Sequence, residues 1–467
     1  MPKALILYLW HGLLLVTLMG SAAYGQVNQQ ELPQKTRILF LLDGSGSMLA
    51  PWENTTRIMA AKRLLAKMVD SLQANQDLHL ALRVYGHQFP SRPQVCEDSK
   101  LEVGFGPNNH QEIIKKLMAI KPQGNTPIAY SLSESAKDFP VDDDARNIII
   151  IITDGLESCD GDPCQVSYEL QKKRIFLKPF VIGIGMDKNY EKQFGCLGQF
   201  FDANNIAAFQ NVLNRALRQT LDKTTVSVEL LDVDGNPNET DVNVTFVNNV
   251  TGEPAYNFVH YRDSQGKPDS VEIDAVMSYD IVVNTLPQVV QRNLAIRPGE
   301  HNVIAIKAPR GTLSLQQRGH TEYDKGVKAI VRKAGSSVII NILDVPGKEQ
   351  YLIGNYDIEV LTLPRKHYTN VQVNPNESTE INIPAPGLLN INASVRGIGS
   401  LYELNENGQQ RWLYNMPEDK TRVTMAIQPG NYHIVFRANS ALGSKYTEIK
   451  KFTITSGSTT NLKLFGR

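Results

Sequence analysis

The sequence predicts a doubly wound α/β domain of the Rossmann-like kind, followed by a series of all-β sandwich modules. Residues 36–222 alternate between the patterns of buried strands and amphipathic helices. After residue 223 the helical spacing stops, and apolar residues alternate with polar ones. Within this second part, the segment Tyr279–Pro287 recurs as Tyr356–Pro364, which indicates internal repeats.

Length and charge limit the classes of protein to consider. The chain has 467 residues, with 48 Lys and Arg against 48 Asp and Glu. That length corresponds to about three to four domains of ordinary size. The balanced charge gives no electrostatic reason to expect nucleic acid or an anionic membrane as a partner.

The first residues of the chain have the pattern of a secretory signal peptide. In Met1–Gly25, Lys3 precedes the apolar run Ala4–Met19, and small residues follow at a cleavage site. An uncleaved N-terminal membrane anchor is the alternative. No later stretch reaches the roughly 20 apolar residues that a membrane-spanning helix needs. We therefore expect an exported protein that is periplasmic, at the cell surface or secreted.

The α/β half is built from apolar runs that alternate with residues at helical spacing. Ile148–Ile152 is a continuous apolar strand, which is typical of a strand buried on both faces of a parallel sheet. The predicted strands are Arg37–Leu42, Leu78–Gly86, Lys100–Phe105, Asn147–Ile152 and Phe180–Gly185. The predicted helices have apolar residues at helical spacing over 58–72, 113–120, 128–136 and 209–221. We expect a mostly parallel sheet with helices on both faces.

Three polar segments lie where ligands bind in such folds. Asp43–Ser47 directly follows the first strand, Gly124–Pro127 opens a helix, and Thr153–Gly155 directly follows the isoleucine strand. Loops after parallel strands meet at the carboxyl edge of the sheet. The segments offer only oxygen donors, from Asp43, Ser45, Ser47, Thr126 and Asp154. Oxygen donors suit a hard cation such as Mg²⁺, although each segment taken alone is also compatible with an ordinary turn.

At these residues the chain resembles the von Willebrand factor type A family. The motif Asp-x-Ser-x-Ser, with a separate Thr and a separate Asp, is the metal-ion-dependent adhesion site of that family, and Asp43–Ser47 matches it. The resemblance covers residues 36–222. It implies that Ser45, Ser47 and Thr126 contact Mg²⁺, or alternatively Mn²⁺ or Ca²⁺. Asp43 and Asp154 would act largely through waters, and an Asp or Glu carboxylate of a protein partner would fill the open position.

Trp52 and the cysteines lie in the same half. Trp52 is either a contact aromatic at the rim of this site or part of the packing at the start of a helix. All four cysteines are here, at Cys96, Cys159, Cys164 and Cys196. An even number in an exported chain favours two disulfides, and three connectivities are possible. A metal cluster is the alternative, but the Cys159–Cys164 spacing with no nearby His is a weak zinc pattern.

The β half divides into three modules, at 224–310, 311–387 and 388–467. Pro429–Ile434 looks like a third copy of the repeated segment. The pattern Gly354–Val360 resembles the terminal hairpin of bacterial Ig-like and carboxypeptidase-regulatory-like modules. Such tandem modules usually hold a head domain away from a surface. The segment Asp232–Pro237 is predicted to be a turn, since it lacks the spacing of a calcium loop.

The sequence contains no catalytic motif such as HExxH, GxSxG, a phosphate-binding loop or GxGxxG. We therefore predict a non-enzymatic binding or adhesion protein, of bacterial origin as its module type suggests. It would capture a protein partner through a metal in the type A domain, presented on a stalk of β modules. The alternative is a structural scaffold subunit of a cell-envelope complex.

Overall fold

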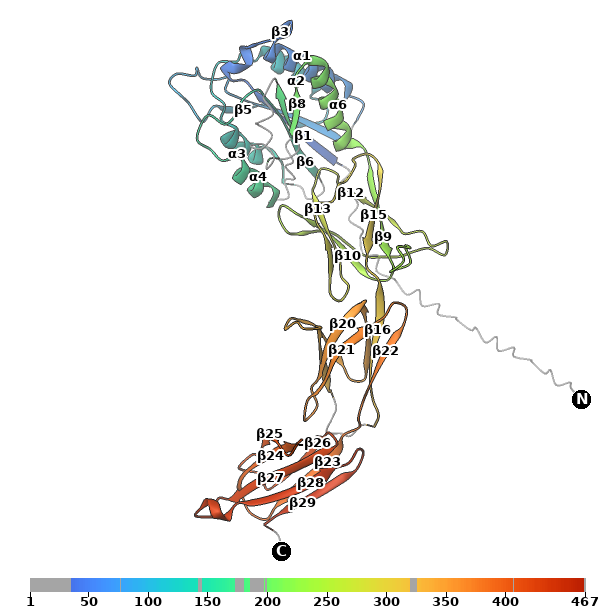
Figure 1. Cartoon of the computed structure of the whole chain (residues 1–467). Coiled ribbons are helices and arrows are strands. Elements are labelled where there is room, and N and C mark those ends of the chain that lie inside the picture. The colour runs from blue at the N-terminus through green and yellow to red at the C-terminus, as the bar shows by residue number, and fades with distance from the viewer. Residues whose placement is uncertain are drawn as a thin grey trace, which may run out of the picture.

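A computed structural model describes residues 35–75, 77–141, 145–172, 180–184, 197, 200–319, 326–405 and 407–465. An α/β head is followed by three groups of strands, arranged end to end in an elongated molecule (Figure 1). The predicted signal peptide and Cys196 lie outside the described residues. Among the helices that the structure describes, none is long and apolar enough to cross a membrane.

The head contains a six-stranded sheet with the strand order β5-β4-β1-β6-β7-β8. The strands are β1 (Lys35–Asp43), β4 (Leu78–Tyr85), β5 (Ser99–Gly106), β6 (Ala145–Thr153), β7 (Phe180–Ile184) and β8 (Phe200–Ala203). All neighbours pair in parallel except β4 and β5, which are antiparallel. The expectation of a mostly parallel sheet is confirmed. The pairing of β1 with β6 places the ends of these two strands side by side.

Helices cover both faces of this sheet. On one face lie α1 (Arg57–Ser71), α2 (His110–Ala119) and α6 (Ile206–Leu221), and on the other lie α3 (Ile128–Asp138) and α4 (Pro163–Lys172). The isoleucines of β6 alternate between the two cores, because Ile150 faces the first set of helices and Ile151 the second. The prediction of a doubly wound α/β domain is thus confirmed. Neither α4 nor the short strand β8 was predicted from the sequence.

Side-chain caps explain where two of the helices begin. The hydroxyl of Thr56 accepts a hydrogen bond of 3.4 Å from the backbone N–H of Met59 and caps α1. Asn205 caps α6 by accepting a bond of 2.7 Å from the N–H of Ala208. Before α1, a short 3₁₀ helix (Gly46–Leu49) and a hairpin of β2 (Pro51–Trp52) and β3 (Thr55–Thr56) lead away from the end of β1.

The C-terminal region consists of strands in mostly antiparallel sheets. The first module contains β9 (Thr224–Leu231), β10 (Asn243–Asn248), β11 (Pro254–Val259), β12 (Ser270–Ile273), β13 (Tyr279–Val283), β14 (Val289–Gln291) and β15 (His301–Lys307). The second contains β16 (Arg310–Gln317), β17 (Lys328–Lys333), β18 (Ile339–Asp344), β19 (Gly347–Leu352), β20 (Gly354–Val360), β21 (Lys366–Val373) and β22 (Ser378–Ile383). The third contains β23 (Gly387–Ala393), β24 (Gly397–Leu404), β25 (Gln410–Asn415), β26 (Arg422–Ile427), β27 (Gly430–Ala438), β28 (Glu448–Ile454) and β29 (Thr459–Leu464).

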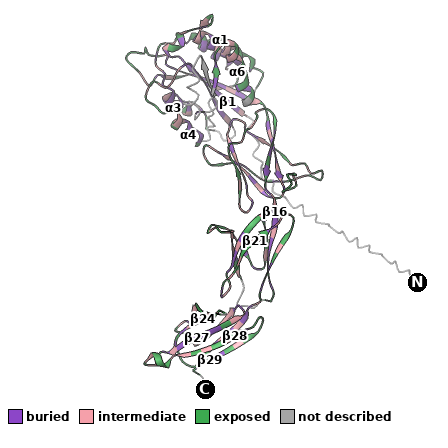
Figure 2. Ribbon diagram, in the orientation of Figure 1, coloured by how far each residue is buried: buried purple, intermediate pink, exposed green. Residues whose placement is uncertain are grey.

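The three modules share one strand order within the described residues. In each, the third, second, fifth and sixth strands form one sheet, and the fourth, first and seventh form another. The first and seventh strands pair in parallel in all three modules. Each pair of sheets encloses its own apolar core, seen as the buried segments of Figure 2. The repeated sequence segments fall on the fifth strand of each module, at β13, β20 and β27.

A buried tyrosine on each fifth strand fixes the chain that precedes it. The hydroxyl groups of Tyr279, Tyr356 and Tyr432 donate hydrogen bonds of 2.6, 2.7 and 2.6 Å to backbone carbonyl oxygens. The acceptors are Asp274, Leu352 and Gln428. Burying the phenol without such a partner would cost stability, so each tyrosine holds its neighbouring loop in place.

The same loops join neighbouring modules. The N–H of Leu352 in the second module donates a bond of 2.8 Å to the carbonyl of Leu286 in the first, and the N–H of Gln428 in the third donates one of 2.7 Å to Leu363 in the second. The side chain of Leu286 packs against the core of the second module, and that of Leu363 against the core of the third. The two module junctions are therefore built alike.

At the junction between the head and the first module, a salt bridge forms at the residue whose carbonyl accepts the tyrosine hydroxyl. The guanidinium of Arg146, at the start of β6, donates bonds of 2.9 and 2.7 Å to the carboxylate of Asp274. Asp274 is the residue whose carbonyl accepts the Tyr279 hydroxyl. Val276, two residues further on, is part of the apolar core of the head. A bidentate, largely buried Arg–Asp pair is both directional and strong.

Candidate metal centre

The candidate site lies at the carboxyl end of the two central strands. Asp43 is the last residue of β1, and Asp154 directly follows β6. Because these strands are parallel neighbours, both carboxylates emerge at the same edge of the sheet. Asp43 is fully buried, and the side chain of Asp154 is fully buried as well.

Hydrogen bonds join four of the five predicted site residues. The carboxylate of Asp43 accepts a bond of 2.8 Å from the N–H of Ser45. The hydroxyl oxygens of Ser45 and Ser47 are 2.9 Å apart, and Ser47 donates a bond of 2.6 Å to Oδ1 of Asp154. Ser47 is exposed, whereas Ser45 is buried. The network therefore runs from the buried end of β1 to the solvent.

The loop after β1 needs glycine to reach this shape. A Cβ at Gly44 would lie 2.7 Å from the carbonyl oxygen of Tyr85, to which the Gly44 N–H itself donates. The N–H of Gly46 donates a bond of 3.0 Å to the carbonyl of Gly124. That bond ties the loop of Ser45 and Ser47 to the segment that carries Thr126.

Thr126 lies near the others but is held by a separate set of contacts. Its N–H donates to the hydroxyl of Ser158 at 2.8 Å, and the N–H of Ser158 donates to the carbonyl of Thr126 at 3.1 Å. A Cβ added at Gly155 would be 3.8 Å from Oγ1 of Thr126 and 3.9 Å from Oγ of Ser47. The two hydroxyls thus both lie close to Gly155, the residue that follows Asp154.

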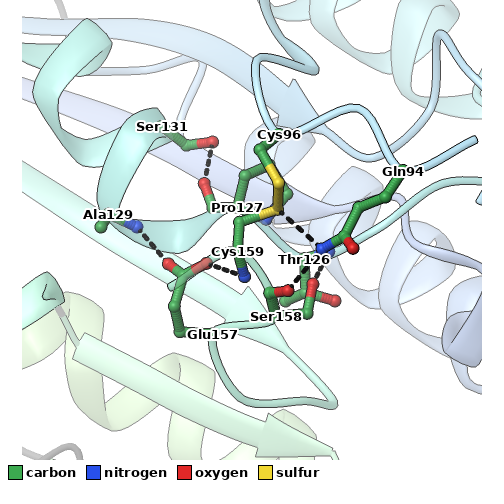
Figure 3. The surroundings of a disulfide bond; sticks show 9 residues. All are labelled: Gln94, Cys96, Thr126, Pro127, Ala129, Ser131, Glu157, Ser158 and Cys159. Carbon is green, nitrogen blue, oxygen red and sulfur yellow. Dashed lines mark hydrogen bonds between the residues drawn. A yellow bond between two sulfur atoms is a disulfide. The ribbon is translucent and has the colours of Figure 1, made fainter. Parts of the chain in front are cut away.

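A disulfide holds the loop that positions Thr126. Cys96, from the segment between β4 and β5, is bonded to Cys159, next to Ser158 (Figure 3). The carboxylate of Glu157 accepts the N–H groups of Cys159 and Ala129, at 2.8 and 2.7 Å, and Gln94 donates to the carbonyl of Ser158 at 2.7 Å. The prediction that these cysteines form disulfides is confirmed by this pair, which belongs to one of the three connectivities left open. Cys164 is also disulfide-bonded.

The charges of the site are concentrated in a small volume. Burial, and next the negative charge of Asp154, raise the pKa of Asp43 to about 6. The bonds from Ser45 and Thr153 act in the opposite direction, and the Thr153 hydroxyl is 2.7 Å from Oδ2 of Asp43. On the other side, Nη1 of Arg57 lies 2.7 Å from Oδ2 of Asp154. The guanidinium of Arg57 therefore offsets part of the negative charge of the two carboxylates.

The donor chemistry fits a hard divalent cation. Two carboxylates and three hydroxyls supply oxygen alone, and such a cation keeps several waters and needs few protein carboxylates. Across the described part of the chain, no group of three or more His, Cys, Asp or Glu residues has the arrangement of a metal site.

Three residues in contact with the candidate site were not predicted as part of it, and the position of Trp52 was undecided. Thr153 and Ser158 lie within a few residues of Asp154, and this closeness in the sequence could have identified them. No feature of the sequence pointed to Arg57. Trp52 is 7% exposed, and its ring lies 6.3 Å from that of Phe209 on α6. It therefore belongs to the packing at the start of α1 rather than to the rim of the site.

The head is an α/β domain with a mostly parallel sheet, and its carboxylates and hydroxyls lie at the carboxyl edge, where such folds bind ligands. The profile of the von Willebrand factor type A domain matches residues 38–244, from β1 to the beginning of β10. The chain therefore belongs, through its head, to the von Willebrand factor type A domain family.

Two bacterial relatives cover the same part of the chain. The uncharacterized protein YwmC of Bacillus subtilis strain 168 is 29% identical over 213 residues, which are 44% of this chain and 92% of YwmC. The uncharacterized protein YwmD of the same strain is 30% identical over 185 residues, which are 38% of this chain and 82% of YwmD. Among solved structures, the conserved hypothetical protein BatB from Bacteroides thetaiotaomicron is similar at 19% identity and a TM-score of 0.31, over 39% of this chain and 98% of BatB.

Proposed function

We propose that this chain is an exported, non-enzymatic binding protein that captures a protein partner through a divalent cation. The cation would be Mg²⁺, or Mn²⁺ or Ca²⁺ in its place, held by Asp43, Ser45, Ser47, Thr126 and Asp154. The observation that carries the proposal is the position of Ser47. Its hydroxyl lies 2.9 Å from that of Ser45 and 2.6 Å from Asp154, and so joins loops that are 107 residues apart in the sequence.

Each residue has a separate task in this proposal. The hydroxyl oxygens of Ser45, Ser47 and Thr126 are the direct ligands, and the two buried carboxylates hold water around the cation. Asp43 also fixes the loop, because it accepts the N–H of Ser45. A bound cation supplies local positive charge, which attracts an Asp or Glu oxygen of the partner.

The loops around the site offer apolar surface for the rest of such a partner. Leu49, two residues after Ser47, is 52% exposed, and Phe89 is 45% exposed. Phe89 lies beside the Thr126 segment, since its carbonyl oxygen would be 2.8 Å from a Cβ at Gly124. An acidic side chain flanked by apolar residues is the partner chemistry that this surface favours.

The β modules would serve as the stalk of this head. Similar hydrogen bonds at the two module junctions support a spacer of fixed geometry. The second candidate, a scaffold subunit of a cell-envelope complex, makes use of the same spacer. It differs in that its association would not depend on the cation.

The test is a titration of the chelator-treated chain, from Gln26 to Arg467, with Mg²⁺ and with Mn²⁺ by calorimetry. We expect one site, which is lost in Asp43→Ala and weakened at least tenfold in Ser47→Ala. Ser133→Ala, an exposed hydroxyl on α3, is the control and should bind as the unchanged chain does. Absence of binding, or binding that Asp43→Ala leaves intact, would exclude the adhesion site and favour the scaffold.

A further inference from the structure

Arg57 lies against the proposed metal site from an unusual position. It is the first residue of α1, and its Nη1 donates a hydrogen bond of 2.7 Å to Oδ2 of Asp154. The Arg57 side chain is 23% exposed, whereas that of Asp154 is fully buried. The other carboxylate oxygen of Asp154 accepts the Ser47 hydroxyl. One carboxylate therefore contacts both a proposed metal ligand and a permanent cation.

The helix itself does not favour a cation at this place. The N-terminus of an α-helix carries partial positive charge, which stabilises anions and opposes Lys and Arg. The first turn of α1 has no acidic residue to offset the charge of Arg57. The contact with Asp154 is therefore what compensates Arg57, and the guanidinium belongs electrostatically to the site.

Arg57 changes the net charge of the site. Asp43 and Asp154 together carry two negative charges when ionised, and the guanidinium leaves one of them uncompensated. A divalent cation bound to two carboxylates alone would give a neutral centre. With Arg57 present, the loaded centre has one excess positive charge, which an anion at the open position would balance.

We propose that Arg57 is an internal counter-cation that makes binding of the metal and of a carboxylate ligand depend on each other. It weakens binding of the metal alone, because it already compensates Asp154. It strengthens binding of the carboxylate to the loaded site, because the centre then carries excess positive charge. This inference rests on the proposed function, since it concerns the same cation and the same open position.

The mutual dependence of metal binding and carboxylate binding can be measured through thermodynamic linkage. If a carboxylate binds better to the loaded site, it must raise the metal affinity by the same factor. The probe is acetate, and the measurement is Mn²⁺ affinity by calorimetry and by the paramagnetic relaxation of water protons. Sodium acetate is compared with sodium chloride at equal ionic strength. For the unchanged chain we expect acetate to tighten Mn²⁺ binding about threefold or more.

Arg57→Gln removes the positive charge of Arg57 and leaves all five proposed metal-site residues in place. We expect this variant to bind Mn²⁺ about tenfold more tightly in chloride, and to lose most of the acetate effect. Arg57→Lys keeps the charge and should retain the acetate effect. Arg63→Gln is the matched control, because Arg63 is an exposed arginine on the same helix. That variant should behave as the unchanged chain does.

The outcomes distinguish the inference from the proposed function. If the unchanged chain binds no Mn²⁺, or if Asp43→Ala binds it equally well, the proposed metal site is wrong. If Mn²⁺ binds through Asp43, and acetate tightens it equally in the unchanged chain and in Arg57→Gln, only the role of Arg57 is overturned. If acetate does not tighten Mn²⁺ binding to the unchanged chain, the inference is overturned without any variant, together with carboxylate capture in the proposed function. Tighter Mn²⁺ binding in Arg57→Gln, with the acetate effect lost, supports the inference.

Discussion

The backbone N–H of Leu352 donates a hydrogen bond of 2.8 Å to the carbonyl oxygen of Leu286, and this bond joins two neighbouring modules. The carbonyl of Leu352 in turn accepts the hydroxyl of Tyr356. Gln428 makes the same pair of contacts, with Leu363 and with Tyr432. Each buried tyrosine thus supports the residue that contacts the preceding module. In the third module, Asn439 and Ser440 stand where the first two have the Leu–Pro pairs of Leu286 and Leu363.

Leu286→Ala should loosen the first of these junctions. The side chain is half-buried against the core of the second module, so its loss is expected to cost about 1–2 kcal/mol. Small-angle X-ray scattering should then show a broader distribution of interatomic distances. Leu361→Ala is the control, because Leu361 is an exposed leucine of the second module. Identical scattering from both variants would mean that the junction does not set the shape of the chain.

Replacing both Cys96 and Cys159 with Ser should affect the fold and the site together. The disulfide spans 63 residues, and the chain-entropy relation assigns a loop of that size about 4 kcal/mol of stability. The bond also anchors the loop of Ser158, which holds the backbone of Thr126. We therefore expect lower resistance to urea and weaker Mn²⁺ binding. Unchanged Mn²⁺ affinity in a less stable variant would limit the disulfide to the fold.

The elements of the head could be predicted because their signals are local. The isoleucine run of β6 and the helical spacing of α1 each lie within one short segment, and a strand followed by a polar loop identifies a sheet edge. In this way Asp43, Ser45, Ser47 and Asp154 were predicted to lie together at one edge of the sheet, and hydrogen bonds join them there. In contrast, α4 is a short helix with few apolar residues, and its pattern is weak.

The contacts that were missed depend on residues far apart in the sequence. Arg57 meets Asp154 across 97 positions, and their contact depends on how the β2–β3 hairpin orients the start of α1. The pairing of Cys96 with Cys159 similarly depends on two loops that meet only in the folded sheet. The spacing of apolar residues along the chain gives no information on such contacts. In the β modules, by contrast, the repeated segments mark the fifth strand of each module.

Gly86→Ala should displace Thr126. Gly86 has a φ of +66°, and a Cβ there would lie against the carbonyl oxygen of Asn125, the residue before Thr126. The left-handed backbone and the clash together are expected to cost about 2–4 kcal/mol. Thermal unfolding and Mn²⁺ titration measure the two effects. Gly104→Ala, with no contact closer than 3.9 Å, should leave both unchanged. Equal behaviour of the two variants would contradict the packing described for Gly86.

The first module should lose stability in acid because of His260. This side chain is 2% exposed, and its Nε2 lies 2.8 Å from the carbonyl oxygen of Val228. Burial lowers the pKa of His260, so the folded module favours the neutral ring, while the unfolded chain titrates near the ordinary value of about 6.5. Below that pH the unfolded state binds more protons, and the stabilisation by His260 is lost as the pH falls further.

Hydrogen exchange of β9 and β10 should therefore speed up between pH 7 and pH 5, after correction for the intrinsic rate. The change should be smaller in His260→Gln and unaltered in His301→Gln, which replaces an exposed histidine of the same module. If His260→Gln shows the same pH dependence as the unchanged chain, another group is responsible for the acid sensitivity.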